Sequence, residues 1–465
     1  MSLSYDYDVV ITGSGPGGYV AAIRAAQLKL KTALIEKDKI GGVCLNIGCI
    51  PSKSIIHQAE IFRNRLKLVS MGVKIDDSGF NYETVFNASR KSADTLSKGV
   101  SYLLKKNGVE VITGTGRLVS DHEVIIDKER KVSGRAVIVA TGSRPRQIEG
   151  FEFDGKRILS SDNALMLKEL PRKVLILGSG AIGVEFAHIL NSFGVEVHLV
   201  EMMERILPVE DSEITAVLKR SFTKRGINIY TSTKALSHKQ SENSVDVTLQ
   251  NSAGEQTVIS VDKVLVVTGR VPNTENIGLE ELGVETEKGF VKVGDWGQTN
   301  VKSVYAIGDI VNTPLLAHVA SKEGEIAVEH IAGQPPARSR IDLTKIPGAV
   351  YCEPQVASFG LTEEQAAAEG VSFNKAMFPY RGAGKAVAAE DAEGMAKIMT
   401  DPSTKEILGV HMVGACATEL IHEFLLAASS ELLPADIASM IHAHPTLSEV
   451  VMEAARAAEG RAIHF

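Results

Sequence analysis

The residues most able to do chemistry are two cysteines, Cys44 and Cys49, which lie five positions apart in a glycine-rich segment. The segment reads Gly41-Gly42-Val43-Cys44-Leu45-Asn46-Ile47-Gly48-Cys49-Ile50-Pro51-Ser52-Lys53. Five residues of regular α-helix would separate the two Cα atoms by roughly 7.5 Å of rise, whereas a disulfide tolerates a separation of about 7 Å at most. If the cysteines pair, the backbone between them must therefore leave ideal helix geometry, and Gly48 permits that departure.

A helix is expected directly after this pair. Pro51 suits the first turn of a helix over Ser52 to about Leu66, because that position needs no N–H donor. Cys49 would then lie at the helix N-terminus, where the helix dipole favours a thiolate. Two unpaired core cysteines and half of a metal site are the alternatives. A zinc site usually needs four ligands at short paired spacings, and no second Cys/His pair completes one here, so the pattern favours a redox dithiol and predicts no metal.

A dinucleotide fingerprint occupies the N-terminal segment. A strand over Asp8 to Thr12 leads into a glycine turn and an alanine-rich helix from Tyr19 to about Leu28, and a second strand, Thr32 to Ile35, ends in Glu36. In this pattern the glycines allow a close approach of pyrophosphate to the helix N-terminus, while the acidic residue accepts hydrogen bonds from ribose hydroxyls. The glycines of the turn are Gly13, Gly15 and Gly18.

The same pattern recurs in the middle of the chain. A strand over Val174 to Leu177 precedes a second glycine turn, and a strand over Glu196 to Val200 ends in Glu201. The glycines of this turn are Gly178, Gly180 and Gly183. Because Glu201 would bind a free 2′-hydroxyl and repel a 2′-phosphate, the second site should prefer NAD over NADP, although Arg205 nearby weakens that preference slightly.

The chain of 465 residues is too long for one core and divides by pattern into several domains. A buried strand that runs into a Thr-Gly turn closes each nucleotide unit, at Thr141-Gly142-Ser143 and again at Thr268-Gly269. We place boundaries after these turns and predict domains at residues 1–145, 146–272, 273–340 and 341–465. Residues 61–111, within the first domain, resemble amphipathic helix and carry no recognisable motif.

The C-terminal domain alternates strands and helices in a way typical of an α+β domain, and it contains no nucleotide fingerprint. Near its end, His444 precedes Pro445, which suits a first helical position, and Glu449 falls in the first turns of the helix. A carboxylate that fixes the tautomer of a histidine is the arrangement of a general base. Taken alone, a histidine before a proline is more often a surface or capping residue. His442 we interpret as structural.

Composition narrows the class of protein. A net charge of -7 with a sequence pI near 6.0 gives no basic surface for nucleic acid or anionic lipid. Residues 1–8 are acidic and lack the basic start of a signal peptide, and the strand after them is interrupted by glycines, so no signal peptide or membrane span is expected. Four cysteines in so long a chain fit a reducing compartment, and we expect a cytoplasmic protein with Cys352 and Cys416 as buried small apolar residues.

The segment Cys-Leu-Asn-Ile-Gly-Cys-Ile-Pro-Ser-Lys resembles the active-site signature of the pyridine nucleotide-disulfide oxidoreductases, and it is most similar to that of the dihydrolipoamide dehydrogenases. The resemblance covers almost the whole chain. It implies an α/β fold with two Rossmann-like FAD/NAD(P)-binding domains and a C-terminal α+β dimerisation domain, a homodimer, tightly bound FAD, one per subunit, and NAD as final acceptor. The implied partners are lipoyl domains and the core acyltransferase of a 2-oxoacid dehydrogenase complex, or the glycine cleavage H protein.

The resemblance also implies cofactor contacts beyond the fingerprint glycines and their acids. An aspartate that meets the flavin ribityl chain corresponds to Asp309, and the following turn that covers the flavin ring corresponds to Leu315, Leu316, Ala317 and His318. The remaining implied contacts are Lys53, Gly116, Thr141, Gly142, Ser143, Glu185 and Gly269.

The mechanism implied by the resemblance oxidises a dihydrolipoyl group. His444, supplied by the partner subunit and held by Glu449, accepts a proton from the substrate dithiol. A substrate thiolate attacks Cys44, and release of the product leaves Cys49 as a thiolate beside the flavin. This agrees with the needs of thiol-disulfide exchange, which are a thiolate attacker, a low-pKa leaving thiol and a proton acceptor.

Two alternatives stay open. A glutathione-type disulfide reductase using NADPH would share Cys44, Cys49 and His444, but Glu201 and the Leu447-Ser448-Glu449 sequence argue against it. A scaffold subunit whose main role is docking onto a 2-oxoacid dehydrogenase core is an alternative of another class. Turnover of lipoamide by the isolated protein would exclude a purely structural role.

Overall fold

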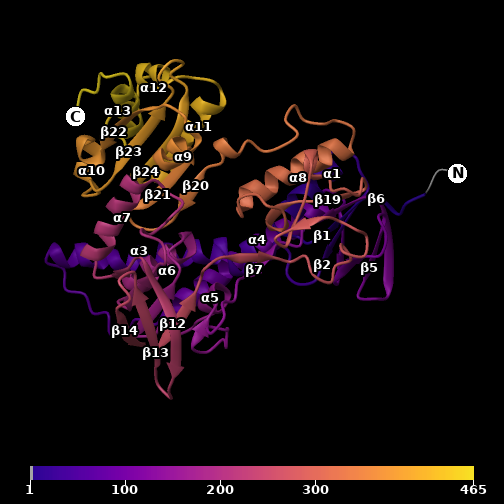
Figure 1. The fold of residues 1–465 in the computed structure, drawn as a ribbon, viewed down its shortest axis with the longest axis horizontal. Coiled ribbons are helices and arrows are strands. Elements are labelled where there is room, and N and C mark those ends of the chain that lie inside the picture. Colours follow the sequence, from indigo (N-terminus) through magenta and orange to yellow (C-terminus); the bar gives the residue numbers. More distant parts are fainter. Residues whose placement is uncertain (1–3, 465) are drawn as a thin grey trace.

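The computed structural model describes residues 4–464, and the expectation about the acidic residues 1–8 therefore falls partly outside the described residues. Figure 1 shows a first nucleotide unit that combines indigo N-terminal elements with the orange β19 and α8, a magenta second unit, and an orange-to-yellow C-terminal unit. The mixed α/β architecture that the sequence predicts is confirmed, with parallel sheets in the two nucleotide units and an antiparallel sheet in the C-terminal unit.

The first unit is built on a parallel sheet in the order β3-β2-β1-β6, and β19 also pairs with β6. Its strands are β1 (Tyr7–Thr12), β2 (Thr32–Glu36), β3 (Glu110–Thr113), β6 (Arg130–Val139) and β19 (Val304–Ala306), with an antiparallel extension of β4 (Gly116–Leu118) and β5 (Glu123–Ile126). Helices α1 (Pro16–Gln27) and α8 (Ala317–Ile331) pack closely against each other. The close packing needs Gly324, because a Cβ there would lie 2.7 Å from the carbonyl oxygen of Gly17.

The second unit repeats this arrangement with the parallel order β11-β10-β9-β15-β8. Its strands are β8 (Ile158–Leu159), β9 (Lys173–Leu177), β10 (Glu196–Val200), β11 (Asn228–Tyr230) and β15 (Lys263–Val266), and its helices are α5 (Ser161–Leu165), α6 (Ala181–Ser192) and α7 (Ser212–Lys224). An antiparallel sheet of β12 (Thr233–Gln240), β13 (Val245–Asn251) and β14 (Gln256–Val261) belongs to the same stretch of chain. The strands of the parallel sheet bury Val, Leu and Ile side chains almost completely, because one face packs against helices and the other packs against β13 and β14.

Three consecutive helices connect β2 to β3: α2 (Gly42–Ile47), α3 (Cys49–Ser70) and α4 (Tyr82–Lys106). Helix α3 begins earlier and runs further than the predicted 52–66 span. The predicted helical stretch 61–111 is interrupted at residues 71–81, where Gly72 and Gly79 lie in a loop, and it ends in β3. Ile55, Ile56 and Ala59 of α3 share one apolar core with the second unit, so α3 joins the two units.

The C-terminal unit is an antiparallel sheet in the order β20-β21-β24-β23-β22 (Figure 1). Its strands are β20 (Gly348–Val350), β21 (Gln355–Gly360), β22 (Asn374–Pro379), β23 (Met395–Thr400) and β24 (Ile407–Gly414), and its helices are α9 (Glu363–Glu369), α10 (Gly384–Ala388), α11 (Ala417–Ser429), α12 (Pro434–Ser439) and α13 (Ser448–Ala458). Two short antiparallel pairs lie elsewhere: β7 (Ser143–Pro145) pairs with the distant β16 (Arg270–Pro272), and β17 (Thr286–Glu287) forms a local hairpin with β18 (Phe290–Val291). The four-part division of the chain stays a prediction.

Candidate active site

Cys44 and Cys49 form a disulfide at the junction of α2 and α3, with their Cα atoms 4.7 Å apart. Helix α2 ends at Ile47, Gly48 leaves helical geometry with φ −145° and ψ −116°, and α3 begins at Cys49. A Cβ on Gly48 would lie 2.9 Å from the carbonyl oxygen of Val43, so the fold-back needs glycine there. The departure from ideal helix geometry is present at the residue where the sequence predicts it, and Cys49 lies at a helix N-terminus.

Helix α4 holds the disulfide loop in place. The Asn46 amide nitrogen donates to the carbonyl oxygens of Ile40 (3.1 Å) and Gly42 (2.9 Å). From α4, Arg90 Nη1 donates to the carbonyl oxygen of Asn46 at 2.7 Å, and Ser97 Oγ donates to that of Ile40 at 2.7 Å. Sequence analysis missed these two α4 residues, because a contact made across more than 40 positions leaves no local pattern.

Two positions of the first glycine turn can only be glycine. Gly13 has a φ of +97°, and a Cβ on it would lie 2.3 Å from the carbonyl oxygen of Ala140. A Cβ on Gly18 would lie 1.9 Å from the carbonyl oxygen of Gly13. Gly15, in contrast, has no atom within 4 Å of its Cβ position and precedes α1, whose first turn has no side-chain cap. The open face of the turn and the uncapped N–H groups therefore fit a pyrophosphate.

The second glycine turn has the same construction. Gly178 has a φ of +101°, and a Cβ on it would lie 2.7 Å from the carbonyl oxygen of Val267. A Cβ on Gly183 would lie 1.9 Å from the carbonyl oxygen of Gly178, while Gly180 again has open space and precedes α6 without a side-chain cap. Each of the two turns therefore fits the pyrophosphate of one dinucleotide.

The acidic residues that end β2 and β10 also make matching contacts. Glu36 accepts hydrogen bonds from the N–H (2.8 Å) and hydroxyl (2.6 Å) of Ser14, and Glu201 accepts from the N–H (2.9 Å) and hydroxyl (2.8 Å) of Ser179. The other carboxylate oxygen of each accepts the N–H two residues further on, at 2.9 Å. Each acid is thus fixed beside the serine that lies between the first two glycines of its turn, where a ribose would lie.

The disulfide segment lies directly against the first glycine turn. The Gly41 N–H donates to the carbonyl oxygen and to the hydroxyl of Ser14, both at 3.1 Å. A Cβ on Gly42 would lie 2.8 Å from the Cα of Gly15, so α2 begins in contact with this turn. A group bound at the first turn would therefore neighbour the disulfide segment.

Lys53 and Glu185, both among the implied cofactor contacts, form an ion pair. Lys53 Nζ lies 2.9 Å from each carboxylate oxygen of Glu185, which is 7% exposed. The pair joins α3, one turn after Cys49, to α6. No signal in the sequence relates these two positions.

Another polar cluster surrounds Asp309. The Ser143 hydroxyl donates to the Asp309 carboxylate, and Arg270 Nε donates to the same hydroxyl at 2.7 Å. The Thr141 hydroxyl donates to a backbone carbonyl oxygen at 2.8 Å, and Gly142 has a φ of +69° with no atom within 4 Å of its Cβ position. The Thr-Gly-Ser turn that the sequence singled out thus meets the Gly-Asp turn that follows β19.

The other implied contacts lie in both nucleotide units, with Gly269 after β15 of the second and the rest in the first. A Cβ on Gly116, at the start of β4, would lie 3.1 Å from the Thr12 methyl at the end of β1, and Gly269 has a φ of +130°. The segment expected to cover a flavin forms the entry to α8, and its residues are Leu315, Leu316, Ala317 and His318. Burial lowers the pKa of His318, against a backbone hydrogen bond with Pro347 that raises it.

Glu323 is a residue of this cluster that sequence analysis missed. Its carboxylate accepts the Gly308 N–H at 2.6 Å and the Thr313 hydroxyl at 2.8 Å, so it holds the turn that carries Asp309. Burial raises the pKa of Glu323 to about 7, and the charge of Asp309 raises it as well. The two hydrogen bonds lower the pKa, but burial outweighs them. The one feature of the sequence that could have indicated Glu323 is a charged residue on the apolar face of the expected helix.

His444 and Glu449 are paired as the sequence predicts. His444 Nδ1 lies 2.9 Å from Glu449 Oε1, and Glu449 Oε2 accepts the Thr446 N–H at 2.9 Å. Burial raises the pKa of Glu449, but the hydrogen bonds from His444 and Thr446 outweigh it, so the pKa lies below its usual value. The His444 side chain is 75% exposed and makes no hydrogen bond to either disulfide cysteine within residues 4–464.

Two expectations about this region are wrong. Pro445 is not a first helical position: α13 begins at Ser448, and the Thr446 hydroxyl before it donates to the carbonyl oxygen of Ala443 at 2.7 Å. Cys416 is not a buried residue, since it is exposed at the start of α11 in left-handed backbone geometry, with a φ of +57°. Cys352 is buried as expected, and burial raises the pKa of its thiol.

Comparison with known proteins now adds to this geometry. The family model for pyridine nucleotide-disulphide oxidoreductases matches residues 7–324, and the model for the dimerisation domain of that family matches residues 346–455. The chain belongs to this family. It is 43% identical over 483 residues to the dihydrolipoyl dehydrogenase of Bacillus subtilis, with 100% of both chains covered.

Other relatives agree. A dihydrolipoyl dehydrogenase of Rhizobium etli is 41% identical and covers 99% of this chain and 100% of its own length, and a leghemoglobin reductase of Glycine max is 41% identical, with 98% and 88% covered. The crystal structure of LpdA from Mycobacterium tuberculosis superposes with a TM-score of 0.88 at 29% identity and covers 96% of this chain and 98% of that one. The resemblance to the dihydrolipoamide dehydrogenases that the sequence indicates is confirmed.

Within residues 4–464, no helix is both long and apolar enough to cross a membrane. In that same part of the chain, no group of three or more His, Cys, Asp or Glu side chains is arranged to hold a metal ion.

Proposed function

We propose that this protein is a dihydrolipoyl dehydrogenase, which oxidises protein-bound dihydrolipoyl groups and reduces NAD. The observation that carries the proposal is the Cys44–Cys49 disulfide, whose segment contacts the first glycine turn through the Gly41 to Ser14 hydrogen bonds. A redox-active disulfide beside one dinucleotide turn, with a second turn in the same chain, suits electron transfer from a dithiol to a nicotinamide. Relatives named dihydrolipoyl dehydrogenase support the substrate.

The cofactors we assign are FAD at the first turn and NAD at the second. When bound, FAD carries the electron pair from the reduced cysteines to the nicotinamide. Gly13, Gly15, Gly18 and Glu36 would hold FAD at its pyrophosphate and ribose, and Gly178, Gly180, Gly183 and Glu201 would hold NAD likewise. The further FAD contacts that we propose are Lys53, Gly116, Thr141, Gly142, Ser143, Asp309, Leu315, Leu316, Ala317 and His318, and the further NAD contacts are Glu185 and Gly269.

The disulfide exchange uses residues of this chain. His444 of the partner subunit, oriented by its bond to Glu449, accepts a proton from one substrate thiol. The resulting thiolate attacks Cys44 Sγ, the bond between Cys44 and Cys49 breaks, and Cys49 leaves as a thiolate that the N-terminus of α3 stabilises. The second substrate thiol then attacks the substrate sulfur bound to Cys44, the mixed disulfide breaks, and the proton of that thiol passes to the departing Cys44 sulfur. The substrate is thus released as a disulfide, and the two cysteines hold its electron pair.

The assembly we propose is a homodimer in the cytoplasm. The match to the dimerisation domain over residues 346–455 supports the homodimer, and so does the 75% exposure of the His444 side chain, which leaves the imidazole free to reach a partner's disulfide. Lipoyl domains of a 2-oxoacid dehydrogenase complex, or the glycine cleavage H protein, are the proposed source of the dithiol. The predicted boundaries after residues 145, 272 and 340 belong to the same proposal.

Steady-state turnover of dihydrolipoamide tests the proposal. We expect reduction of NAD, far slower reduction of NADP, and no turnover by the Cys44→Ser variant, which should still bind FAD. Cys416→Ser is the matched control and should retain turnover, because that thiol lies outside the disulfide segment. Turnover confined to NADPH and glutathione disulfide would favour the glutathione-type reductase, and no turnover at all would favour a scaffold.

A further inference from the structure

Arg205 lies on a loop that returns to the second glycine turn. Glu201 Oε1 accepts the Met203 N–H at 2.9 Å, and the Leu207 N–H donates to the carbonyl oxygen of Ser179 at 2.9 Å. Residues 202–207 are therefore tied at both ends to the turn and its acid. Arg205 is the only basic residue in this segment, and a guanidinium beside a ribose is the group that binds a 2′-phosphate.

The guanidinium of Arg205 is engaged by the C-terminal unit instead. Arg205 Nη1 lies 3.3 Å from Glu364 Oε1, and Nη2 donates to the carbonyl oxygen of Pro208 at 3.4 Å. The third nitrogen, Nε, is buried and has no hydrogen-bond partner in the described part of the chain. Glu364 lies in the first turn of α9, more than 150 positions further along the chain.

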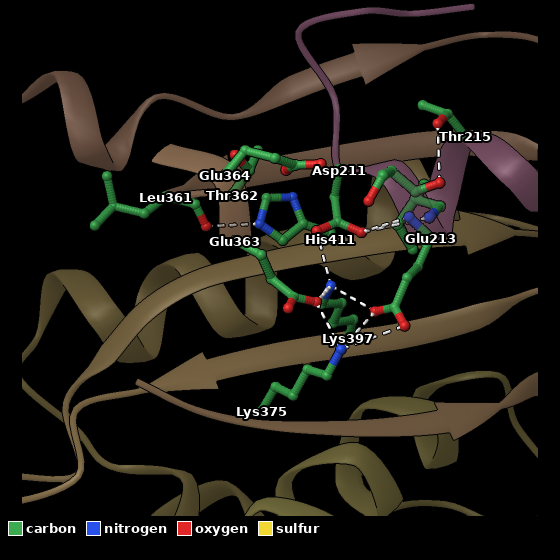
Figure 2. A network of polar contacts seen from close by, with 12 residues as sticks. Asp211, Glu213, Thr215, Leu361, Thr362, Glu363, Glu364, Lys375, Lys397 and His411 are labelled. Atoms are coloured by element: carbon green, nitrogen blue, oxygen red, sulfur yellow. Dashed lines mark hydrogen bonds and ion pairs between the residues drawn. The ribbon is translucent and has the colours of Figure 1, made fainter. Parts of the chain in front are cut away.

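Buried ions fix α9 against the second unit (Figure 2). Lys397 Nζ, on β23, lies 2.8 Å from Asp211 Oδ2 and 2.6 Å from Glu213 Oε2, and it also pairs with Glu363. The side chains of Lys397 and Asp211 are 0% exposed, and Asp211 caps the N-terminus of α7. Lys375, on β22, contacts Glu213 and Glu363 in the same network.

Glu363 stays ionised in this network. Burial raises its pKa, but the hydrogen bonds and charges of Lys375 and Lys397 dominate and lower it to about 2. Glu364 is the next residue, so the contacts that hold Glu363 also hold the start of α9 close to the loop of Arg205. The orientation of Arg205 is thus set by a part of the fold that carries no nucleotide fingerprint.

We propose that Glu364 is a specificity-determining residue that disfavours NADP by holding the guanidinium of Arg205 in an ion pair, away from the ribose 2′-position. This inference rests on the proposed function only in assigning a nicotinamide dinucleotide to the second turn. Glu201 alone would repel a 2′-phosphate, but a free arginine four positions later would offset that repulsion. The ion pair with Glu364 removes the offset.

Nucleotide binding to the holoenzyme tests the role of Glu364. Adenosine 2′,5′-bisphosphate and AMP differ only in the 2′-phosphate, so their dissociation constants, measured by calorimetry, isolate its contribution. Glu364→Gln should tighten binding of the bisphosphate roughly two- to fivefold, the range expected on releasing a partly exposed arginine, and should leave AMP unchanged. Glu369→Gln, at the other end of α9, is the matched control and should change neither constant.

The double variant Arg205→Gln with Glu364→Gln separates this role from a merely structural one. The gain for the bisphosphate should vanish when Arg205 is absent. A gain that persists without Arg205, an equal change for both nucleotides, or no change in Glu364→Gln would overturn the proposal. Because no lipoyl substrate is present, the outcome stands apart from whether the protein turns over dihydrolipoamide.

Discussion

Lys53 and Glu185 form an ion pair in which the lysine nitrogen lies 2.9 Å from both carboxylate oxygens, 132 positions apart in the chain. The contact connects the helix that starts at Cys49 with the helix that follows the second glycine turn. Tyr351 of the C-terminal unit completes it, since its N–H donates to Glu185 Oε1 at 3.1 Å and its ring centroid lies 4.5 Å from Lys53 Nζ. The disulfide helix, the second nucleotide unit and the C-terminal unit therefore meet at this pair.

Replacing Lys53 by methionine should destabilise the protein. Glu185, which is only 7% exposed, would remain as a charge without its cation. The Lys53 side chain is 34% exposed, so water already screens part of the interaction and limits the loss. We expect the free energy of unfolding in urea to fall by about 1–3 kcal/mol. Lys173→Met breaks an exposed pair with Glu196 of similar length, 3.0 Å, and should cost under about 1 kcal/mol. Equal losses in the two variants would contradict this reading.

Lys397→Met should have a larger effect. It would leave Asp211, which is 0% exposed, as a buried charge without its cation, and loss of one partner of such a pair costs about 3–5 kcal/mol. Lys375→Met removes a cation that contacts two of the same carboxylates but is 39% exposed, and it should cost about 1 kcal/mol or less. Chemical denaturation of the two variants in parallel measures the contrast. A loss in Lys397→Met no greater than in Lys375→Met would exclude the buried network as a major source of stability.

His444→Gln should lower dihydrolipoamide turnover roughly 10²–10⁴-fold, the usual contribution of a general base, with the FAD content unchanged. His442→Gln is a close control, because His442 also pairs with a carboxylate, Glu423, at 2.8 Å, but its side chain is only 5% exposed and faces inward. We expect that variant to keep its turnover. Glu449→Gln should give a smaller loss than His444→Gln, since it only removes the carboxylate that orients the ring. Equal losses in His444→Gln and His442→Gln would point to a structural cause.

Glu323 should make stability fall as pH rises. Its pKa is about 7 in the folded protein and about 4.3 in an unfolded chain, so the unfolded state loses this proton first and the folded state is penalised increasingly between these values. Glu323→Gln keeps an acceptor for the Gly308 N–H but does not titrate. The advantage of the variant over the wild type in free energy of unfolding should therefore grow by about 2–3 kcal/mol from pH 5 to pH 8. A constant difference across this range would show that Glu323 does not carry the effect.

Features decided by local sterics could be predicted from the sequence. Gly13 and Gly178 are required by backbone oxygen atoms that lie 2.3 and 2.7 Å from their Cβ positions, and the same requirement recurs wherever the turn is built. The break at Gly48 follows equally from the reach of a disulfide between Cys44 and Cys49. The pairing of His444 with Glu449 needs only five residues of chain.

Features decided by packing between units could not be predicted. Lys53 with Glu185, and Lys397 with Asp211 across 186 positions, become partners only once the units are placed against each other. Arg90 and Ser97 lie in the stretch 61–111, where the sequence shows amphipathic helix and no motif, and they hold the disulfide loop. The exposed position of Cys416 depends likewise on where α11 begins, which its small apolar neighbours do not reveal.

The central claim is that dihydrolipoamide reduces the Cys44–Cys49 disulfide, and thiol labelling tests it most directly. The protein would be incubated with dihydrolipoamide in the absence of NAD, alkylated, and mapped by peptide mass spectrometry against an untreated sample. The account predicts alkylation of Cys44 and Cys49 only after treatment, with Cys416 labelled equally in both samples. Treatment that leaves Cys44 and Cys49 unlabelled, in protein that unfolding and chemical reduction then make fully reactive, would contradict it.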